Sequence, residues 1–200
     1  VQPMAAAASE AHYETADPAD FSLVAWFDAT GRNEVWSLRI PKMLSWLYYF
    51  RFSGEVEGIN NIQAQYEELY GPGDYVPLVA LTYWTFRIMV GIGTLMVGVA
   101  LAALYLPWKK WPEKWTKWLK WGVWLIALPY LANTAGWILT ETGRQPWIVH
   151  GLLLTKDGVS PLSPGIVVMS LVGFVLIYGV LMGFDVYLLA KYAKAGLHAD

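Results

Sequence analysis

Residue types that can bind haem iron recur at helical spacing in one long apolar stretch. Met89, Gly93 and Met96 lie at positions i, i+4 and i+7, so they share one face of a helix. A methionine thioether can be an axial haem ligand, and Gly93 one turn away would leave room for a flat porphyrin. Arg87 could neutralise a propionate of the same haem. From spacing alone, the alternative is that Met89 packs in a helix interface while Arg87 pairs with a partner helix.

A second polar group closes a later apolar stretch. Trp137 and Glu141 lie four residues apart, which puts both on one helix face. A carboxylate there could ligate iron or relay protons. Arg144 follows, and its planar guanidinium can hold a carboxylate or a propionate through two hydrogen bonds. A salt bridge between Glu141 and Arg144 at a helix end explains the same spacing.

A third polar group lies near the start of the chain, where Glu10 and Glu14 flank His12. The two carboxylates share a face if this segment forms a short helix. Carboxylates and histidine can take protons from a quinol as it is oxidised. The alternative is an acidic helix face that is simply solvated.

Composition indicates a membrane protein. Of the 200 residues, 56% are hydrophobic and only 15% are charged, and the net charge is −2. A soluble domain usually carries about 25% charged residues. The 12 Trp and 12 Tyr are residue types that gather at membrane–water interfaces. The absence of Cys excludes disulfides and thiolate metal sites in this chain, and the three His lack the spacing of a zinc or copper site.

Three long apolar stretches must position these groups: residues 76–105, 119–140 and 165–189. Each exceeds the roughly 20 residues that a spanning helix needs. The sequence therefore predicts an all-α, polytopic membrane protein with about three transmembrane helices. Residues 1–75 are expected to form an extramembrane region, and residues 76–200 the transmembrane, cofactor-binding region.

The expected extramembrane region is acidic. It holds 11 acidic against 4 basic residues, a balance of −7, whereas the remainder holds 5 against 10. Residues 58–70 predict an amphipathic helix, which the Gly-Pro-Gly sequence at 71–73 ends. The chain begins at Val1 without the basic start and apolar core of a signal peptide. We therefore expect a piece of a longer protein or one half of a split subunit.

The placement of lysines predicts the orientation in the membrane. The connection at 107–118 and the C-terminal tail carry most of the lysines outside the apolar stretches, so both are expected on the cytoplasmic side. Residues 1–75 and the connection at 142–164 would then lie on the outer side. Four tryptophans punctuate the cytoplasmic connection, and interfacial anchoring explains them better than a nucleic-acid surface does.

Several motifs together resemble those of one family. Residues 136–147, which read Gly-Trp through Glu and then Gly-Arg-Gln-Pro-Trp, resemble the signature of cytochrome bd-type quinol oxidase subunit I. Residues 86–91 (Phe-Arg-Ile-Met-Val-Gly) match a second motif of that family. Residues 2–15, with Gln-Pro-Met, Glu-Ala and Tyr-Glu-Thr, resemble its quinol-binding loop, and residues 71–75 resemble the segment ahead of the next helix. The resemblance covers nearly the whole chain and corresponds to the C-terminal part of the subunit.

The resemblance implies a role for each candidate residue. Met89 would be an axial ligand of the low-spin haem b, with Arg87 beside that haem. Glu141 would ligate the iron of the high-spin haem b, with Trp137 packed against it. Arg144 would bind haem propionates.

The implied reaction is the haem-dependent oxidation of quinol with reduction of dioxygen to water. Glu10 would belong to the quinol site, and the oxygen-site haem would be haem d or a third haem b. One position departs from the family pattern, because Ala5 stands where a lysine usually precedes the quinol-site glutamate. This departure favours, as the alternative, a structural or regulatory member of the family that does not oxidise quinol.

The resemblance also implies partners in the prokaryotic cytoplasmic membrane. The family's haem-ligating histidines lie in helices upstream of this region, so the upstream half of subunit I or a partner chain would supply them. A small second oxidase subunit, membrane lipid and quinol complete the expected partners, and no nucleic acid is expected. A transporter or assembly subunit unrelated to haem is a third hypothesis, which Asp185 in the last apolar stretch permits.

Overall fold

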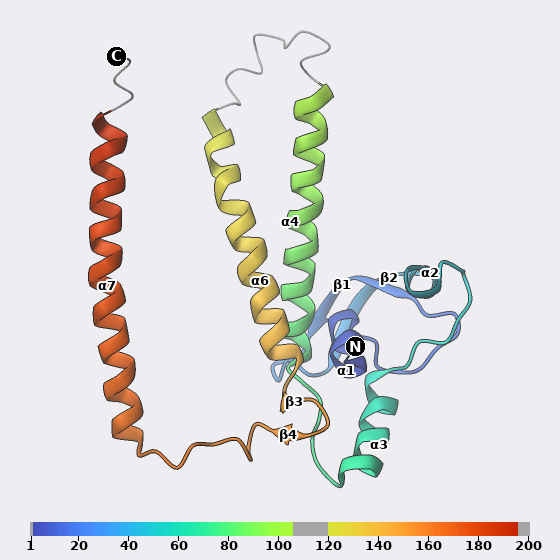
Figure 1. Cartoon of the computed structure of the whole chain (residues 1–200). Coiled ribbons are helices and arrows are strands. Elements are labelled where there is room, and N and C mark those ends of the chain that lie inside the picture. Colours follow the sequence, from blue (N-terminus) through green and yellow to red (C-terminus); the bar gives the residue numbers. More distant parts are fainter. Residues whose placement is uncertain (1, 106–119, 196–200) are drawn as a thin grey trace. The chain divides into compact units, whose positions relative to one another are not determined.

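The computed structural model describes residues 2–105 and 120–195, which belong to two compact units, Val1–Gly158 and Val159–Asp200 (Figure 1). The elements in chain order are α1 (Pro3–Glu10), β1 (Phe21–Phe27), β2 (Glu34–Ile40), α2 (Met43–Tyr49), α3 (Ile59–Tyr70), α4 (Val79–Tyr105), η3 (Lys120–Ile126), α6 (Ala127–Gly143), β3 (Trp147–Val149), β4 (Leu153–Leu154) and α7 (Pro164–Ala195). The first unit holds every element except α7. The connection at 107–118, with its expected cytoplasmic placement, lies outside the described residues.

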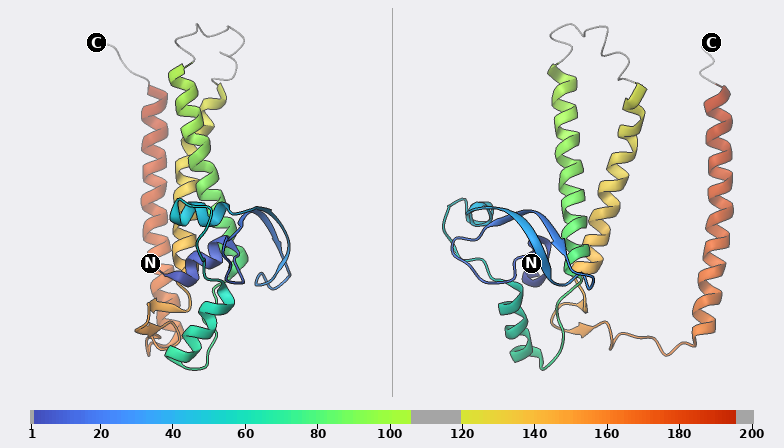
Figure 2. Two further views of the ribbon diagram at one scale, coloured as in Figure 1. Left: turned by 90° about the vertical axis from the view of Figure 1, so that its right-hand side faces the viewer. Right: turned by 180° about the vertical axis from the view of Figure 1, so that it is seen from behind.

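Helices α4 and α6 run antiparallel and pack against one another (Figure 2). A Cβ added at Gly136 of α6 would lie 2.9 Å from Met89 Sδ of α4. One added at Gly143 would lie 3.6 Å from Thr82 Cγ2. Gly136 and Gly143 are as many residues apart on α6 as Met89 and Thr82 are on α4. The two contacts therefore define the register in which the helices pack. Glycines at these positions let the helices approach closely, as is common where helices pack in membranes.

Two of the described helices are long and apolar enough to cross a membrane, α4 with 27 residues and α7 over 31 residues. The remaining expected span, 119–140, is built differently. Its first part is the 3₁₀ helix η3, and α6 has 17 residues and continues to Gly143. The expected class, a helical protein with membrane-spanning segments, is confirmed.

Two antiparallel β hairpins accompany the helices, and the sequence pattern predicted neither of them. In β1–β2, Trp26 pairs with Trp36, and the register shifts twice along the ladder. The turn between the strands is held by Asp28, whose carboxylate accepts a hydrogen bond from Asn33 Nδ2 at 2.9 Å. These register shifts interrupt the strict alternation by which a strand is recognised in a sequence.

The expected helix over 58–70 is present as α3, which ends at Gly71 with a φ of +92°. Glycine suits this position because side chains disfavour positive φ. The outcome agrees with the Gly-Pro-Gly sequence that predicted the end of the helix.

The core of the first unit joins its N-terminal region to the base of α4. Ala8 of α1, Ile62 of α3, Tyr83 of α4 and Trp147 of β3 are all buried in one apolar cluster. Residues before and after position 75 therefore share one hydrophobic core and form one packed unit. The division at 75 into extramembrane and transmembrane regions stays a prediction about position relative to the membrane.

Helix α7 forms the second unit by itself. Its large apolar side chains are exposed along its length, and Asp185 is exposed among them. A helix that is apolar all round needs lipid or other helices around it. Its length and composition agree with the expected last span.

Candidate functional site

A buried ion pair joins α1 to α4 at the centre of the candidate site. Arg87 Nη2 lies 2.7 Å from Glu10 Oε2, and the two side chains are 13% and 8% exposed. The same nitrogen donates to the backbone oxygen of Ser22 in β1 at 2.5 Å. One guanidinium therefore connects α1, β1 and α4.

Aromatic rings enclose the Arg87 guanidinium. Its central carbon lies 4.7 Å from the ring centroid of Phe21 and 4.5 Å from that of Tyr83. The hydroxyl of the fully buried Tyr83 shares a hydrogen bond with Ser22 Oγ at 3.1 Å. A cation held over aromatic rings gains about 0.5–2 kcal/mol. Arg87 Nε is buried and has no hydrogen-bond partner in the described structure, so it remains free to donate to a bound group.

Burial changes the acidity of Glu10. Desolvation raises the pKa of its carboxyl above the ordinary value of 4.5, although the hydrogen bond and the charge of Arg87 act in the opposite direction. A carboxyl with a raised pKa takes up a proton closer to neutral pH than a solvated glutamate does. This property suits a group that accepts protons from a substrate.

The three N-terminal polar residues do not share a helix face. Helix α1 ends at Glu10, and Ala11 turns the chain with a φ of +48°. His12 is buried and its Nε2 donates to the backbone oxygen of Val56 at 3.1 Å. Glu14 is exposed and accepts a hydrogen bond from Asn60 Nδ2. The expected helical pairing of Glu10 with Glu14 is wrong, because the left-handed residue after Glu10 ends the helix first.

Met89 is half-buried, and its sulfur lies beside Gly136 of α6. On the same helix, a Cβ added at Gly93 would meet nothing within 4 Å. The Met89 thioether is therefore one helical turn from a part of the α4 surface, at Gly93, against which no other described side chain packs. In the described structure, the sulfur contributes to helix packing and also lies next to an open surface.

Glu141 and Arg144 form the salt bridge that their spacing permits. Arg144 Nη2 lies 2.6 Å from Glu141 Oε1, with side chains 33% and 42% exposed. Trp137, one turn earlier, is 67% exposed. All three side chains thus lie on a partly open surface at the end of α6, where a further group can reach them.

A cleft of about 440 Å³ is lined by residues of α1 and of the end of α6, which are also in contact with one another. Its lining consists of residues in or directly next to α1, α4, α6 and β3: Gln2, Ala5, Ala6, Ser9, Phe86, Leu139, Thr140, Gly143, Arg144 and Ile148. Arg144 is the charged residue among them. A Cβ added at Gly143 would lie 3.3 Å from Ala5 Cβ, so Ala5 packs directly against the motif that carries Arg144.

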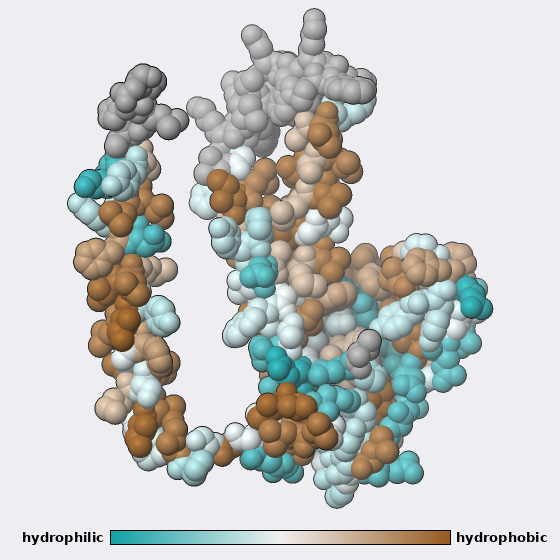
Figure 3. Space-filling model, in the orientation of Figure 1, coloured by the Kyte–Doolittle hydropathy of each residue, from teal (hydrophilic) through white to brown (hydrophobic). Residues whose placement is uncertain are grey.

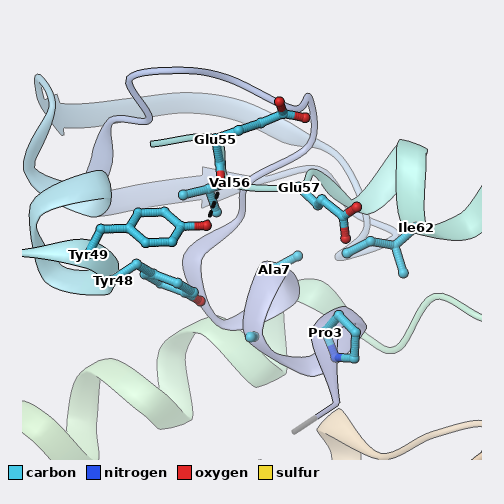
Figure 4. Close-up of a pocket in the computed structure, with 9 residues that line it drawn as sticks. Pro3, Ala7, Tyr48, Tyr49, Glu55, Val56, Glu57 and Ile62 are labelled. Carbon is cyan, nitrogen blue, oxygen red and sulfur yellow. Dashed lines mark hydrogen bonds between the residues drawn. The ribbon is translucent and has the colours of Figure 1, made fainter. Parts of the chain in front are cut away.

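A second cleft, of about 390 Å³, lies on another side of α1 and is shown in Figure 4. Pro3 and Ala7 of α1 face Tyr48 and Tyr49 of α2 across it. The Tyr49 hydroxyl donates to the backbone oxygen of Glu55 at 2.7 Å. Both clefts border the helix that carries Glu10.

One polar pair was missed by the sequence analysis. Tyr66 Oη and His150 Nε2 lie 3.0 Å apart, although the residues are 84 positions apart in the chain. Burial raises the pKa of the Tyr66 hydroxyl. The His150 ring also packs against Trp147, whose Nε1 is buried without a hydrogen-bond partner in the described structure. No local pattern links residues this far apart, so the sequence carries no signal for the pair.

The donor set suits the cofactor that the resemblance implies. A thioether and a carboxylate can each ligate a haem iron, and the Arg144 guanidinium beside the Glu141 carboxylate can bind a propionate. The unpartnered Nε of Arg87 and the bare helix surface at Gly93 fit such a group. Among the described residues, no cluster of three or more His, Asp or Glu could hold a bare metal ion.

Comparisons with known proteins agree on one family. The family model described as "Cytochrome bd terminal oxidase subunit I" matches residues 1–197. The "Cytochrome bd ubiquinol oxidase subunit 1" of Bacillus subtilis is 42% identical over 201 residues, which cover 100% of this chain and 43% of that protein. The "Cytochrome bd-II ubiquinol oxidase subunit 1" of Escherichia coli is 30% identical, over 98% of this chain and 49% of that protein.

A solved structure has the same fold. The bd oxidase from Geobacillus thermodenitrificans superposes with a TM-score of 0.76 at 31% identity, over 98% of this chain and 43% of that chain. The chain thus spans less than half the length of the relatives it matches.

Proposed function

The chain belongs to the cytochrome bd terminal oxidase subunit I family, and on that premise we propose that it is part of a membrane-bound enzyme that oxidises quinol and reduces dioxygen to water. The chain would contribute haem ligands and part of the quinol site. The remaining length of its relatives would contribute the rest of the active enzyme.

The Glu10–Arg87 ion pair is the observation that carries this proposal. It joins the segment that resembles a quinol-binding loop to α4, two residues before Met89. The partner of the candidate proton acceptor is therefore two residues from a candidate haem ligand on the same helix. Quinol oxidation needs this combination, because it releases protons and electrons together.

On this proposal, Met89 and Glu141 would ligate the irons of the low-spin and the high-spin haem b, respectively. Arg87 and Arg144 would bind propionates, and the exposed Trp137 would pack against the high-spin haem. The haems, when bound, supply electron transfer and oxygen binding, with haem d or a third haem b at the oxygen site. In the α4–α6 register Met89 is level with Gly136, so Glu141 lies about 7.5 Å further along the helix axis.

The protein's own residues handle the quinol and its protons. Glu10, with its raised pKa, accepts a proton from a quinol hydroxyl. Arg87 donates to the Glu10 carboxylate and to the Ser22 backbone oxygen at the same time. The second contact fixes the guanidinium, and the guanidinium in turn holds the Glu10 carboxylate in place. The cleft that Ser9 and Phe86 line offers room for a flat headgroup beside the chain neighbours of Glu10 and Arg87.

Partners and location follow from the same proposal. The upstream half of subunit I, or a partner chain, would supply the histidine ligands, and a small second subunit would complete the complex. The membrane is the prokaryotic cytoplasmic membrane. Residues 1–75 and 142–164 would lie on its outer side, with residues 107–118 and the C-terminus in the cytoplasm.

A reduced-minus-oxidised optical spectrum of the purified complex tests the haem assignment. Met89→Leu should remove the low-spin haem b signal, because leucine cannot ligate iron. Met169→Leu is the matched control, since Met169 lies 70% exposed on α7. A complex that contains no haem, or a Met89→Leu complex with an unchanged spectrum, would contradict the proposal.

A second candidate function is a structural or regulatory member of the family without quinol oxidation. Ala5 carries it, because Ala5 lines the cleft beside Arg144 where the family usually places a lysine. A quinol titration of the natural complex and of Ala5→Lys separates the two. Turnover that appears only in Ala5→Lys would favour the second candidate, and turnover in the natural complex would exclude it.

A further inference from the structure

We propose that β1, β2 and α2 form a docking surface for the headgroup layer of an anionic lipid bilayer, the same bilayer that α4 crosses. The docking surface is defined by the exposed apolar side chains of the hairpin and of residues 47–52, with Lys42 and Arg51. This inference rests on α4 as a membrane span and goes beyond the proposed haem and quinol chemistry.

One face of the β1–β2 hairpin is apolar and uncovered. Trp26 pairs across the ladder with Trp36, and Val24 pairs with Leu38. The two tryptophans are 67% and 57% exposed. A hairpin face in contact with water is normally polar, and an apolar patch of this kind marks an interaction surface.

Helix α2 and the turn after it extend this apolar surface with aromatic residues. Phe50 and Phe52 are 80% and 65% exposed, and three further large side chains of α2 are exposed beside them: Leu47, Tyr48 and Tyr49. Aromatic side chains of this density are typical of segments that lie in the interfacial layer of a membrane.

The charge of this segment is opposite to that of its surroundings. Residues 35–53 contain Arg39, Lys42 and Arg51 and no acidic residue, whereas residues 1–75 as a whole have a balance of −7. Arg39 is paired with Glu34 at 2.6 Å. Lys42 and Arg51 are exposed and form no ion pair with any described residue, so both remain available to lipid phosphates.

Two carboxylates of the same region are held by backbone amides. Asp20 Oδ1 accepts from the Lys42 N–H at 3.0 Å, and Asp17 Oδ1 accepts from the Gly54 N–H at 2.7 Å. These contacts keep both carboxylates at the backbone and away from an ion pair with the two free cationic side chains.

The position of the surface agrees with a bilayer. Figures 1 and 2 show the hairpin and α2 on the side of the N-terminal region toward which α4 extends, whereas α3 lies on the opposite side. Figure 3 shows apolar side chains along that upper edge, next to the lower part of α4. A bilayer crossed by α4 would therefore face the hairpin and α2 and leave α3 in water.

Depth-dependent fluorescence quenching tests the proposal on the purified complex in nanodiscs that contain phosphatidylglycerol. The chain has no Cys, so Trp36→Cys and Phe50→Cys each introduce one labelling position in a complex whose other cysteines have been replaced. Leu69→Cys on α3, at a residue that is 70% exposed, is the control. Labels at 36 and 50 should be quenched several-fold more by a nitroxide on the lipid headgroup than the label at 69, and less by iodide.

Two outcomes would overturn the proposal. Labels shielded from both quenchers would show that another part of the complex covers the surface, and labels quenched by iodide alone would show that it faces water. The double variant Lys42→Glu/Arg51→Glu tests whether the two cationic side chains bind anionic lipid. Quenching of the label at position 36 by the lipid nitroxide should fall in this variant to the value measured in phosphatidylcholine nanodiscs. Unchanged quenching would refute a preference for anionic lipid. These readouts need no haem or quinol turnover, so they fail independently of the proposed function.

Discussion

Met89 of α4 and Gly136 of α6 face each other where the two helices pack, and a Cβ at position 136 would lie 2.9 Å from the Met89 sulfur. Carbon and sulfur atoms that are not bonded do not approach this closely, so a Cβ at position 136 would force the Met89 side chain or the helix to move. The position of the candidate ligand atom therefore depends on the absence of a side chain on the neighbouring helix.

Gly136→Ala should displace Met89 and weaken the low-spin haem signal in the reduced-minus-oxidised spectrum. Because Met89 is a flexible side chain, this shift should cost less than the about 1–3 kcal/mol of overpacking in a rigid core, and it offsets part of the gain of about 1 kcal/mol in helix propensity. Gly98→Ala is the control, because a Cβ there meets nothing within 4 Å. Equal spectra and equal thermal stability of both variants would show that the contact does not position the sulfur.

Glu10→Gln should lower quinol oxidation by a factor of about 10²–10⁴, since glutamine cannot accept a proton. In the natural complex the ionised carboxylate is the acceptor and burial raises the pKa of Glu10. Turnover should therefore fall with decreasing pH at a point above the ordinary value of 4.5. Steady-state turnover against pH measures both. Glu14→Gln, at an exposed glutamate, should keep the natural profile, and an equal loss in both variants would contradict a special role for Glu10.

Arg87→Leu should destabilise the complex strongly, because it leaves the Glu10 carboxylate buried without its partner. Breaking a buried ion pair costs about 3–5 kcal/mol, and Glu10→Leu in the same chain should recover part of the loss. The midpoint of thermal denaturation measures the change. Arg32→Leu is the control, since the Arg32–Asp74 pair is exposed and such pairs contribute about 0–1 kcal/mol. Similar denaturation midpoints for Arg32→Leu and Arg87→Leu would show that the buried Glu10–Arg87 pair stabilises the fold no more than the exposed Arg32–Asp74 pair does.

Because its imidazole is buried, His12 should make the folded protein less stable as the pH falls below neutral. Burial lowers the pKa of its imidazole below 6.5, its value in an unfolded chain. As the pH falls from 6.5 towards the lowered pKa, the unfolded state gains a proton that the folded state does not bind, so the free energy of unfolding decreases. His12→Gln should flatten this part of the stability–pH curve, which denaturant titration at several pH values would show. A slope that persists in the variant would assign it to another group.

The elements with strong local signals were predictable. Uninterrupted apolar stretches predicted α4 and α7, since a helix is the structure that satisfies its own backbone in lipid. The Gly-Pro-Gly sequence predicted the end of α3. The β1–β2 hairpin was missed because its register shifts break the alternation. The possible short helix through Glu10 and Glu14 does not form, because Ala11, which carries no sequence mark of its left-handed conformation, follows the end of α1 at Glu10.

The sequence by itself determined the family, the helical membrane class and the residue types available for iron and proton chemistry, because these depend on local composition and on ordered motifs. Tertiary structure alone decided that Arg87 meets Glu10 across 77 positions of chain and that Met89 meets Gly136. Contacts between distant segments depend on the register of packed helices and on burial, and neither is encoded in any local pattern. The same packing raises the pKa of Glu10, since desolvation exists only once α1, β1 and α4 come together.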